Sequence, residues 1–239
     1  HMEMKTGIET FDGVKRLIIV AAHPDDLETL CGGTVVQLVQ RGVKVFSVNC
    51  TLGDIGTQDA ATTRPAVATT RLLEAEEAAR ILGIEQVASL GHHDGELVAD
   101  LELRAQIARL YRSTQADTLF TFDPYWPGQI HPDHRAAGQA ALDAYMPSKM
   151  PLYRPEQLRE PDAGLGRIER VFLFSTAREP DISIDVTPVY DSKLAACMAH
   201  RSQFPKGLEN LEWLQNMDEE NGKAAGFRRA ETFKQMIVW

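Results

Sequence analysis

The sequence has few cysteines and no long apolar run, and each absence narrows the possible classes of protein. Cys31, Cys50 and Cys197 are the only cysteines among 239 residues, and they form no Cys-x-x-Cys pair. Three cysteines without paired spacing predict no framework of disulfide bonds, which favours a protein of a reducing compartment. No apolar stretch approaches the ~18 residues of a membrane-spanning helix. The segment before Leu17 carries three acidic residues, unlike a secretory leader, so we expect a cytoplasmic protein with no membrane span.

An excess of positive charge is also missing. The chain has 25 Lys and Arg residues against 34 Asp and Glu residues, which gives a formal net charge of −9. A surface that follows nucleic-acid phosphates or binds anionic lipids needs a basic excess. We therefore expect neither nucleic acid nor a membrane surface as a partner. The chain is long enough to bury a large core without disulfides or a structural metal.

Short apolar segments alternate with stretches of helical periodicity through the first part of the chain. The expected strands are residues 17–22, 43–50, 86–90 and 118–122, and the expected helices are residues 28–40, 71–82, 101–111 and 133–144. This alternation predicts an α/β fold, with a Rossmann-like, mainly parallel sheet and helices on both faces. Residues 17–22 are continuously apolar, which is typical of a strand buried on both faces.

The pattern changes after Tyr145. Four prolines between residues 146 and 166 predict an irregular connection. We expect further strands at residues 171–175 and 182–186, and further helices at residues 189–201, 208–221 and 226–238. No repeat or linker is visible, so we expect a single domain over residues 1–239, with its core at about 17–145 and C-terminal additions over 146–239. The apolar stretch 227–239 is a candidate interface for a homo-oligomer.

Two His-Pro-Asp segments follow expected strands. His23-Pro24-Asp25-Asp26 comes after the first strand, and His131-Pro132-Asp133-His134 comes after the fourth. The carboxyl ends of parallel strands share one edge of the sheet, where ligands bind, so we expect the two segments to meet there. Asp25 or Asp26 could instead simply cap the helix that follows. The recurrence of one tripeptide at equivalent positions favours a functional site.

The residue types in these segments suit a catalytic metal. Two imidazoles and one carboxylate form a zinc ligand set that leaves a position open for water. His23 and Asp26 lie three residues apart and can face one point, and either His131 or His134 must complete the set. A remaining carboxylate is then free to act as a base, and a remaining histidine is free to donate to an oxyanion. Fe²⁺ or Co²⁺ would accept the same ligands as Zn²⁺.

At these residues the sequence resembles the LmbE/PIG-L family of zinc-dependent deacetylases, which act on N-acetylglucosaminyl compounds. Five segments match in order within about residues 17–145: AHPDDLETLCGG, TLGDIGT, TRLLEAEEAARILG, LGHHDG and DPYWPGQIHPDHRAAG. Beyond residue 145 only fragments match, notably residues 199–204. The resemblance implies a hydrolase that removes an N-acetyl group from an N-acetylglucosamine-type small-molecule conjugate, and so a small amino-sugar substrate as partner.

The resemblance also implies roles for individual residues. It assigns metal ligation to His23, Asp26 and His134, catalysis to Asp25, His131 and Asp133, and contact with sugar hydroxyls to Arg71 and Asp94. In this scheme water at a Zn²⁺ ion attacks the acetamide. Asp25 is the general base, a protonated His131 stabilises the oxyanion, and Asp133 orients His131.

Two other functions remain as alternatives. One is an amidase that cleaves a larger thiol or sugar conjugate, and the other is a metal-binding oligomer without turnover. A nucleotide-binding Rossmann module is disfavoured, because no Gly-x-Gly-x-x-Gly turn follows the first strand. We expect Tyr125 and Trp126 as a candidate sugar-stacking wall, and His200 on an exposed helix surface.

Overall fold

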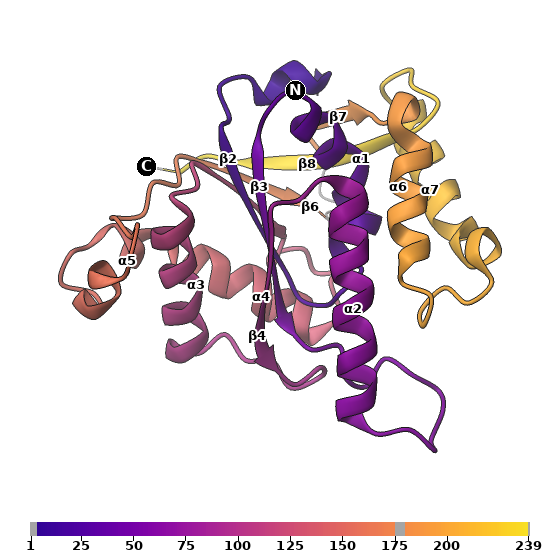
Figure 1. The fold of residues 1–239 in the computed structure, drawn as a ribbon. Coiled ribbons are helices and arrows are strands. Elements are labelled where there is room, and N and C mark those ends of the chain that lie inside the picture. The colour runs from indigo at the N-terminus through magenta and orange to yellow at the C-terminus, as the bar shows by residue number, and fades with distance from the viewer. Residues whose placement is uncertain (1–3, 175–179, 239) are drawn as a thin grey trace.

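The computed structural model describes residues 4–174 and 180–238. Within them, one eight-stranded sheet has the strand order β1-β7-β8-β6-β5-β2-β3-β4 (Figure 1). The strands are β1 (Lys5–Thr6), β2 (Arg16–Ala21), β3 (Lys44–Thr51), β4 (Gln86–His92), β5 (Thr118–Phe122), β6 (Arg170–Phe174), β7 (Ile182–Asp185) and β8 (Ala230–Met236).

Helices cover both faces of this sheet, as the alternating sequence pattern predicts. The α-helices are α1 (Asp26–Gln40), α2 (Arg64–Leu82), α3 (Leu101–Thr114), α4 (Pro132–Asp143), α5 (Tyr145–Lys149), α6 (Tyr190–Ala199) and α7 (Glu212–Lys223). Short 3₁₀ helices occupy Ile8–Phe11, Pro155–Arg159, Thr187–Val189 and Gly207–Leu211. Figure 1 shows α1, α2 and α6 on one side of the sheet and α3 and α4 on the other.

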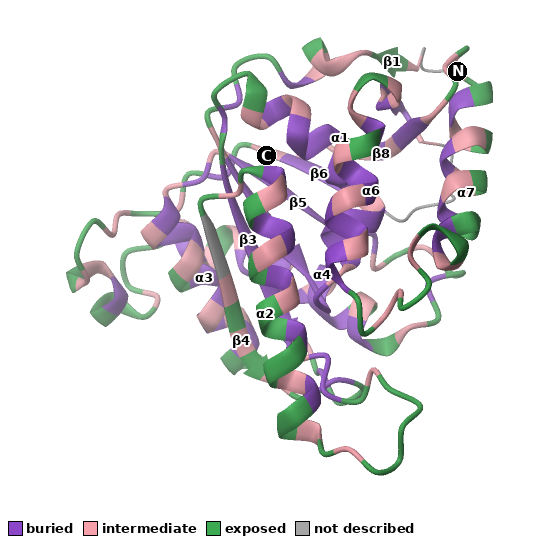
Figure 2. Ribbon diagram, turned by 45° about the vertical axis from the view of Figure 1, so that its right-hand side comes forward, coloured by how far each residue is buried: buried purple, intermediate pink, exposed green. Residues whose placement is uncertain are grey.

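The central strands are buried, and they pair mainly in parallel. β2 pairs in parallel with β3 and β5, β3 with β4, and β5 with β6, whereas β8 is antiparallel to both β6 and β7. β2 is buried along nearly its whole length, because helices lie over both of its faces (Figure 2). Removal of continuous apolar strands from water is the main favourable contribution to folding. Among the described residues, no helix has the length and apolar character needed to cross a membrane.

The order of the strands creates the place for a site. From β2 the chain moves outward to β3 and β4, and it then returns to the opposite side of β2 to form β5. Neighbouring strands whose connections leave in opposite directions open a crevice beyond their carboxyl ends. The segments that follow β2 and β5 both begin at this crevice, and they are the two His-Pro-Asp segments.

The C-terminal part differs from the sequence prediction in two respects. The helix expected over residues 226–238 is wrong, because Ala230–Met236 forms β8 between β6 and β7. The oligomer interface expected over 227–239 stays a prediction, and residue 239 lies outside the described residues. The connection 146–166 contains two short helices, α5 and Pro155–Arg159. The strand expected at 171–175 is β6, and residue 175 again lies outside the described residues.

Helix α1, which follows the first His-Pro-Asp segment, is broken in the middle and capped from a distant strand. Cys31 has non-helical angles (φ −145°, ψ 15°), and the next turn begins anew. The N–H groups of Gly33 and Thr34 donate to the two carboxylate oxygens of Glu231, at 2.9 and 2.7 Å. The Nζ atom of Lys193, fully buried, lies 2.9 Å from Glu231 and 2.7 Å from Asp218. β8 thus fixes α1 through hydrogen bonds to the Glu231 carboxylate, whose charge is balanced by the buried Lys193 of α6.

We predict that Glu231→Ala lowers the free energy of unfolding by about 3–5 kcal/mol, because it leaves the buried Lys193 without one of its anionic partners and the α1 donors uncapped. Urea denaturation measures the change. Glu209→Ala is the control, because it removes only an exposed ion pair with Lys206. Its free energy of unfolding should stay within about 0.5 kcal/mol of the parent's. Equal effects in the two variants would contradict the structural role of Glu231.

Candidate metal centre and active site

The loop after β2 is not an ordinary helix cap. Asp25 stands at the N-cap position of α1 with a φ of 111°, and its side chain makes no capping hydrogen bond. The Oδ2 atom of Asp26 instead accepts from the N–H groups of Ala22 and His23, at 3.0 and 2.7 Å. A positive φ at a non-glycine residue is costly and is maintained only where surrounding contacts fix it. The interpretation of these acids as helix caps is therefore wrong.

The second His-Pro-Asp segment is placed by the start of α4. His131 occupies the N-cap position, and its Nδ1 atom accepts from the N–H of Asp133 at 3.2 Å. His134 lies in the first turn of α4 and stacks on Phe122 at the end of β5, with ring centroids 4.0 Å apart. Its Nδ1 atom is 3.2 Å from the side-chain oxygen of Gln129. The end of β5 and the start of α4 together orient the imidazoles of His131 and His134.

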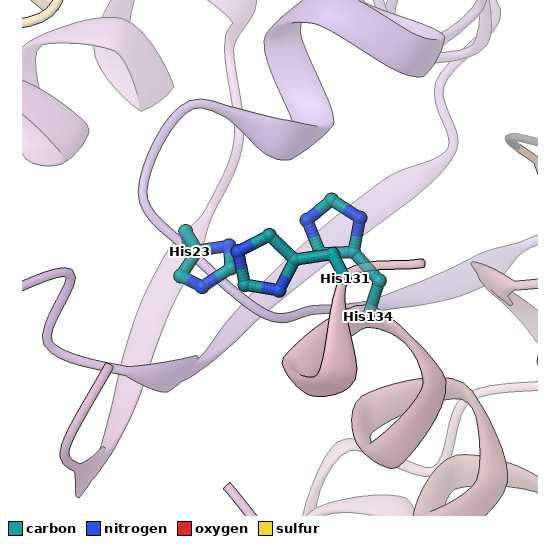
Figure 3. A group of neighbouring side chains, drawn as sticks. All are labelled: His23, His131 and His134. Atoms are coloured by element: carbon teal, nitrogen blue, oxygen red, sulfur yellow. The ribbon is translucent and has the colours of Figure 1, made fainter. Parts of the chain in front are cut away.

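The two segments meet, as the fold predicts. His23, His131 and His134 each offer a ring nitrogen within 4.8 Å of the others (Figure 3). Asp26 lies between two of them, with Oδ2 3.5 Å from Nδ1 of His23 and Oδ1 3.3 Å from Nε2 of His134. The carboxylate of Asp26 is thus in contact with the imidazoles of His23 and His134, and these are the three residues expected as ligands.

The other side of His23 faces two more carboxylates. Its Nε2 atom lies 3.0 Å from Asp94 Oδ1 and 3.1 Å from Asp133 Oδ2, and all three side chains are buried. Asp133 also accepts from the N–H groups of Gly95 and Leu97. Carboxylates behind a histidine fix its tautomer and its orientation toward a metal.

These contacts correct the expected partner of Asp133 and show a further partner of Asp94. The carboxylate of Asp133 does not orient His131: it contacts His23, and only the backbone N–H of Asp133 reaches His131. Asp94 is buried and directed at His23, and its expected contact with a sugar hydroxyl stays a prediction. Both acids therefore support the ring of His23 from behind.

Arg71 makes contacts that the sequence did not predict. It is only 3% exposed, and its guanidinium donates to the carbonyl oxygens of Gly53 and Pro24 and, at 2.9 Å, to Oδ2 of Asp25. A Cβ atom on Gly53 would lie 2.4 Å from this guanidinium, so the glycine is needed for the close approach. Arg71 thus holds the loop and the side chain of Asp25, and its expected contact with a sugar hydroxyl stays a prediction.

The charges of the cluster call for a cation. Burial acts against a charged imidazole, but the carboxylates of Asp26, Asp133 and Asp94 prevail and raise the pKa of His23 to about 12. Burial also acts against the charged form of Asp26 and would raise its pKa, yet His134 and His23 hold that pKa well below its usual range. Because a ligating imidazole must be neutral, a divalent ion would displace the proton and supply the positive charge. The donor set fits such an ion.

Two further groups have shifted acidities. Burial raises the pKa of Asp25 from the ordinary 3.8 to about 6, and Arg71 opposes this rise. Burial, followed by the neighbouring imidazoles of His134 and His23, lowers the pKa of His131, and Asp133 only partly opposes that shift. Because Nδ1 of His131 accepts a hydrogen bond, a proton on the neutral ring lies on Nε2.

A cleft of about 320 Å³ opens onto these residues. Its lining residues are Asp25, Asp26, Thr29, Leu30, His134, Gln203, Phe204 and Trp213. The last three come from the C-terminal part, which the sequence reasoning did not connect with the site. Tyr125 and Trp126, the expected stacking wall, are not among the lining residues.

His200 anchors the turn that carries Gln203 and Phe204 into the cleft. Its expected exposure is wrong, since the side chain is fully buried, with Nε2 3.4 Å from Oε1 of Glu28 in α1. Its carbonyl oxygen accepts from the N–H groups of Gln203 and Phe204. The matching fragment 199–204 was the one sequence signal that pointed here.

Comparisons with known proteins agree with this architecture. The family described as GlcNAc-PI de-N-acetylase (PIG-L) matches residues 18–145. The diacetylchitobiose deacetylase of Thermococcus kodakarensis is 32% identical over 227 residues, covering 93% of this chain and 84% of that protein. A probable N-acetyl-α-D-glucosaminyl L-malate deacetylase 2 of Bacillus cereus is 30% identical, covering 84% of this chain and 94% of that protein.

A solved structure is similar over nearly the whole chain. The N,N′-diacetylchitobiose deacetylase from Pyrococcus horikoshii, complexed with its inhibitor MPG, superposes with a TM-score of 0.89 at 31% identity, covering 95% of this chain and 86% of that chain. The match extends well beyond residue 145, so the strands and helices of the C-terminal part belong to the shared fold.

We predict that, in metal-free protein, Asp25→Asn stabilises the fold at pH 7.5 and has little effect near pH 4. The folded pKa of about 6 exceeds the ordinary 3.8, so the folded protein loses stability relative to the unfolded chain as pH rises between these values. Asn avoids that loss. Denaturant midpoints at the two pH values measure the effect.

Asp26→Asn is the matched control, and its expected sign is opposite. The pKa of Asp26 is lowered in the folded protein, so its charge contributes stability at pH 7.5 that the variant loses. Destabilisation at pH 7.5 by both variants would show that the environment of Asp25 is not as described.

Proposed function

Because the chain belongs to the PIG-L family of N-deacetylating hydrolases, we propose that it is a metal-dependent deacetylase that releases acetate from an N-acetylglucosamine-type small-molecule conjugate. One observation carries the proposal: Asp26 joins His23 and His134, while the adjacent Asp25 faces the cleft outside that contact set. Water adds to the acetamide carbonyl, and the C–N bond breaks to give acetate and a free amine. The cleft volume of about 320 Å³ favours a small substrate over a large acyl conjugate.

We propose His23, Asp26 and His134 as the ligands of a divalent ion. Two imidazoles and one carboxylate suit Zn²⁺, and they also accept Fe²⁺ or Co²⁺. When bound, such an ion supplies the Lewis acidity that makes water a nucleophile near neutral pH. Asp94 and Asp133 keep the ring of His23 in position by accepting from its Nε2–H.

Asp25 is the proposed general base. Its Oδ2 atom is held by Arg71, which leaves Oδ1 to take the proton of the attacking water. Its pKa of about 6 is close to neutral pH, where a base is both largely deprotonated and basic enough to act. The same carboxyl then returns the proton to the departing amine nitrogen, so that the charges balance at the end of the cycle.

His131 is the proposed donor to the oxyanion. The N–H of Asp133 occupies Nδ1, so the proton on Nε2 is free to donate as the carbonyl oxygen gains charge. The lowered pKa favours a neutral imidazole in this role rather than the imidazolium inferred from the sequence. Removal of one such donor costs about 10²–10³ in rate in other hydrolases.

We also propose that the chain forms one domain and acts in the cytoplasm. The strands β6, β7 and β8 complete the sheet that the earlier strands begin, which supports a single folding unit. Cys31, Cys50 and Cys197 are buried and unpaired, as expected for a protein in a reducing compartment.

We predict that the zinc-loaded protein releases acetate from N,N′-diacetylchitobiose or a related N-acetylglucosaminide, and that Asp25→Asn lowers kcat by about 10²–10⁴ while zinc stays bound. The substitution removes a base and not a ligand. Acetate assays and metal analysis on the same preparation measure both quantities. Asp191→Asn, on the exposed side of α6, should behave as the parent. Full turnover by zinc-loaded Asp25→Asn would refute the base, and an inactive parent would refute the function.

We predict that His134→Ala fails to retain one equivalent of zinc after dialysis, because it removes a ligand from the proposed set of three. Metal content and a competition titration with a chromophoric chelator measure this loss. The control is His92→Ala, whose side chain contacts Gln106 and belongs to neither group of candidate metal donors. Unchanged zinc affinity in folded His134→Ala protein would show that the ligand set is wrong.

A further inference from the structure

One wall of the cleft is aromatic and comes entirely from the C-terminal part. Trp213, in the first turn of α7, is 51% exposed although it is one of the largest apolar side chains in the protein. Phe204 and Gln203 stand beside it in the same cleft as Asp25 and His134. An aromatic ring left half-open within a reaction cleft offers a flat apolar face to whatever binds there.

This wall is held in place before any ligand binds. The turn 200–204 is anchored by the buried His200, whose carbonyl oxygen accepts from the N–H groups of Gln203 and Phe204. The side-chain amide of Gln203 donates to the carbonyl oxygen of Gly56 at 2.9 Å, which ties the turn to the loop after β3. A fixed wall loses little conformational freedom on binding.

The side chains that line the cleft disfavour anionic substrates. None of its eight lining residues is Lys or Arg, and two of them are carboxylates. Arg71 lies next to Asp25, but its guanidinium is buried and donates to Gly53, Pro24 and Asp25. Apart from the proposed divalent ion, which the acetamide group would occupy, a carboxylate or phosphate on the substrate would therefore meet no cationic side chain among the lining residues.

We propose that Trp213 is a specificity-determining residue that stacks on a second, uncharged pyranose ring, so that the substrates are neutral N-acetylglucosaminyl saccharides rather than anionic conjugates. The lining combines apolar Leu30, Phe204 and Trp213 with polar Thr29 and Gln203, which suits a sugar ring with its apolar face and its rim of hydroxyls. This inference rests on the proposed function, because it places the acetamide at Asp25 and the second ring at Trp213.

The experiment compares acetate release from N-acetylglucosamine, N,N′-diacetylchitobiose and N-acetylglucosaminyl malate. The parent should have the highest kcat/KM on the disaccharide. Trp213→Ala should lower kcat/KM for the disaccharide roughly tenfold, mainly through KM, and leave the monosaccharide nearly unchanged. Trp213→Phe keeps a flat aromatic face and should retain most of the activity. The matched control is Leu208→Ala, because Leu208 is 50% exposed but does not line the cleft.

A binding readout separates this inference from the proposed function. In an Asp25→Asn background, N,N′-diacetylchitobiose should change the tryptophan fluorescence, and the change should vanish when Trp213→Phe is added. Equal losses on monosaccharide and disaccharide in Trp213→Ala, or a parent that prefers the malate conjugate, would overturn the inference. If the parent releases acetate from none of the three compounds, the proposed function fails, and the fluorescence titration alone still decides whether Trp213 meets a saccharide.

Discussion

The carboxylate of Asp26 joins the two segments on which the site is built. One oxygen accepts from the N–H groups of Ala22 and His23 at the end of β2, and it also lies near the His23 ring. The other oxygen faces His134 on α4. These segments meet only because β2 and β5 are neighbours whose connections leave in opposite directions. The topology thus brings the groups together, and one carboxylate fixes how they face each other.

Such a concentration of charge is costly to bury, and the surrounding structure compensates for it. Arg71 neutralises Asp25 and fastens the loop through the carbonyl oxygens of Pro24 and Gly53. Behind α1, Glu231 caps the break at Cys31 and is itself paired with Lys193. Buried ions are tolerated when each is paired and hydrogen-bonded. The C-terminal part therefore supports the N-terminal metal loop as well as lining its cleft.

The sequence predicts the strands and the meeting of the two segments well, because buried parallel strands are continuous apolar runs whose order follows from the alternation with helices. It fails at β8, where residues such as Ala230 and Glu231 favour helix locally but pairing with β6 and β7 decides the outcome. It also assigns the carboxylate of Asp133 to His131 instead of His23 and does not foresee the contact of Arg71 with Asp25, since motif spacing does not determine side-chain direction. The burial of His200 depends on packing against α1 and has no local signal.

Among the described residues, two groups of side chains place three candidate donors within reach of one cation. One is the histidine cluster that includes His23 and His134, and the other is formed by His23, Asp94 and Asp133. Anomalous diffraction at the zinc absorption edge, on crystals of the zinc-loaded protein, distinguishes them directly. The account predicts one peak at bonding distance from His23, Asp26 and His134, with Asp25 outside the coordination sphere. A peak held by Asp94 and Asp133 instead would contradict it.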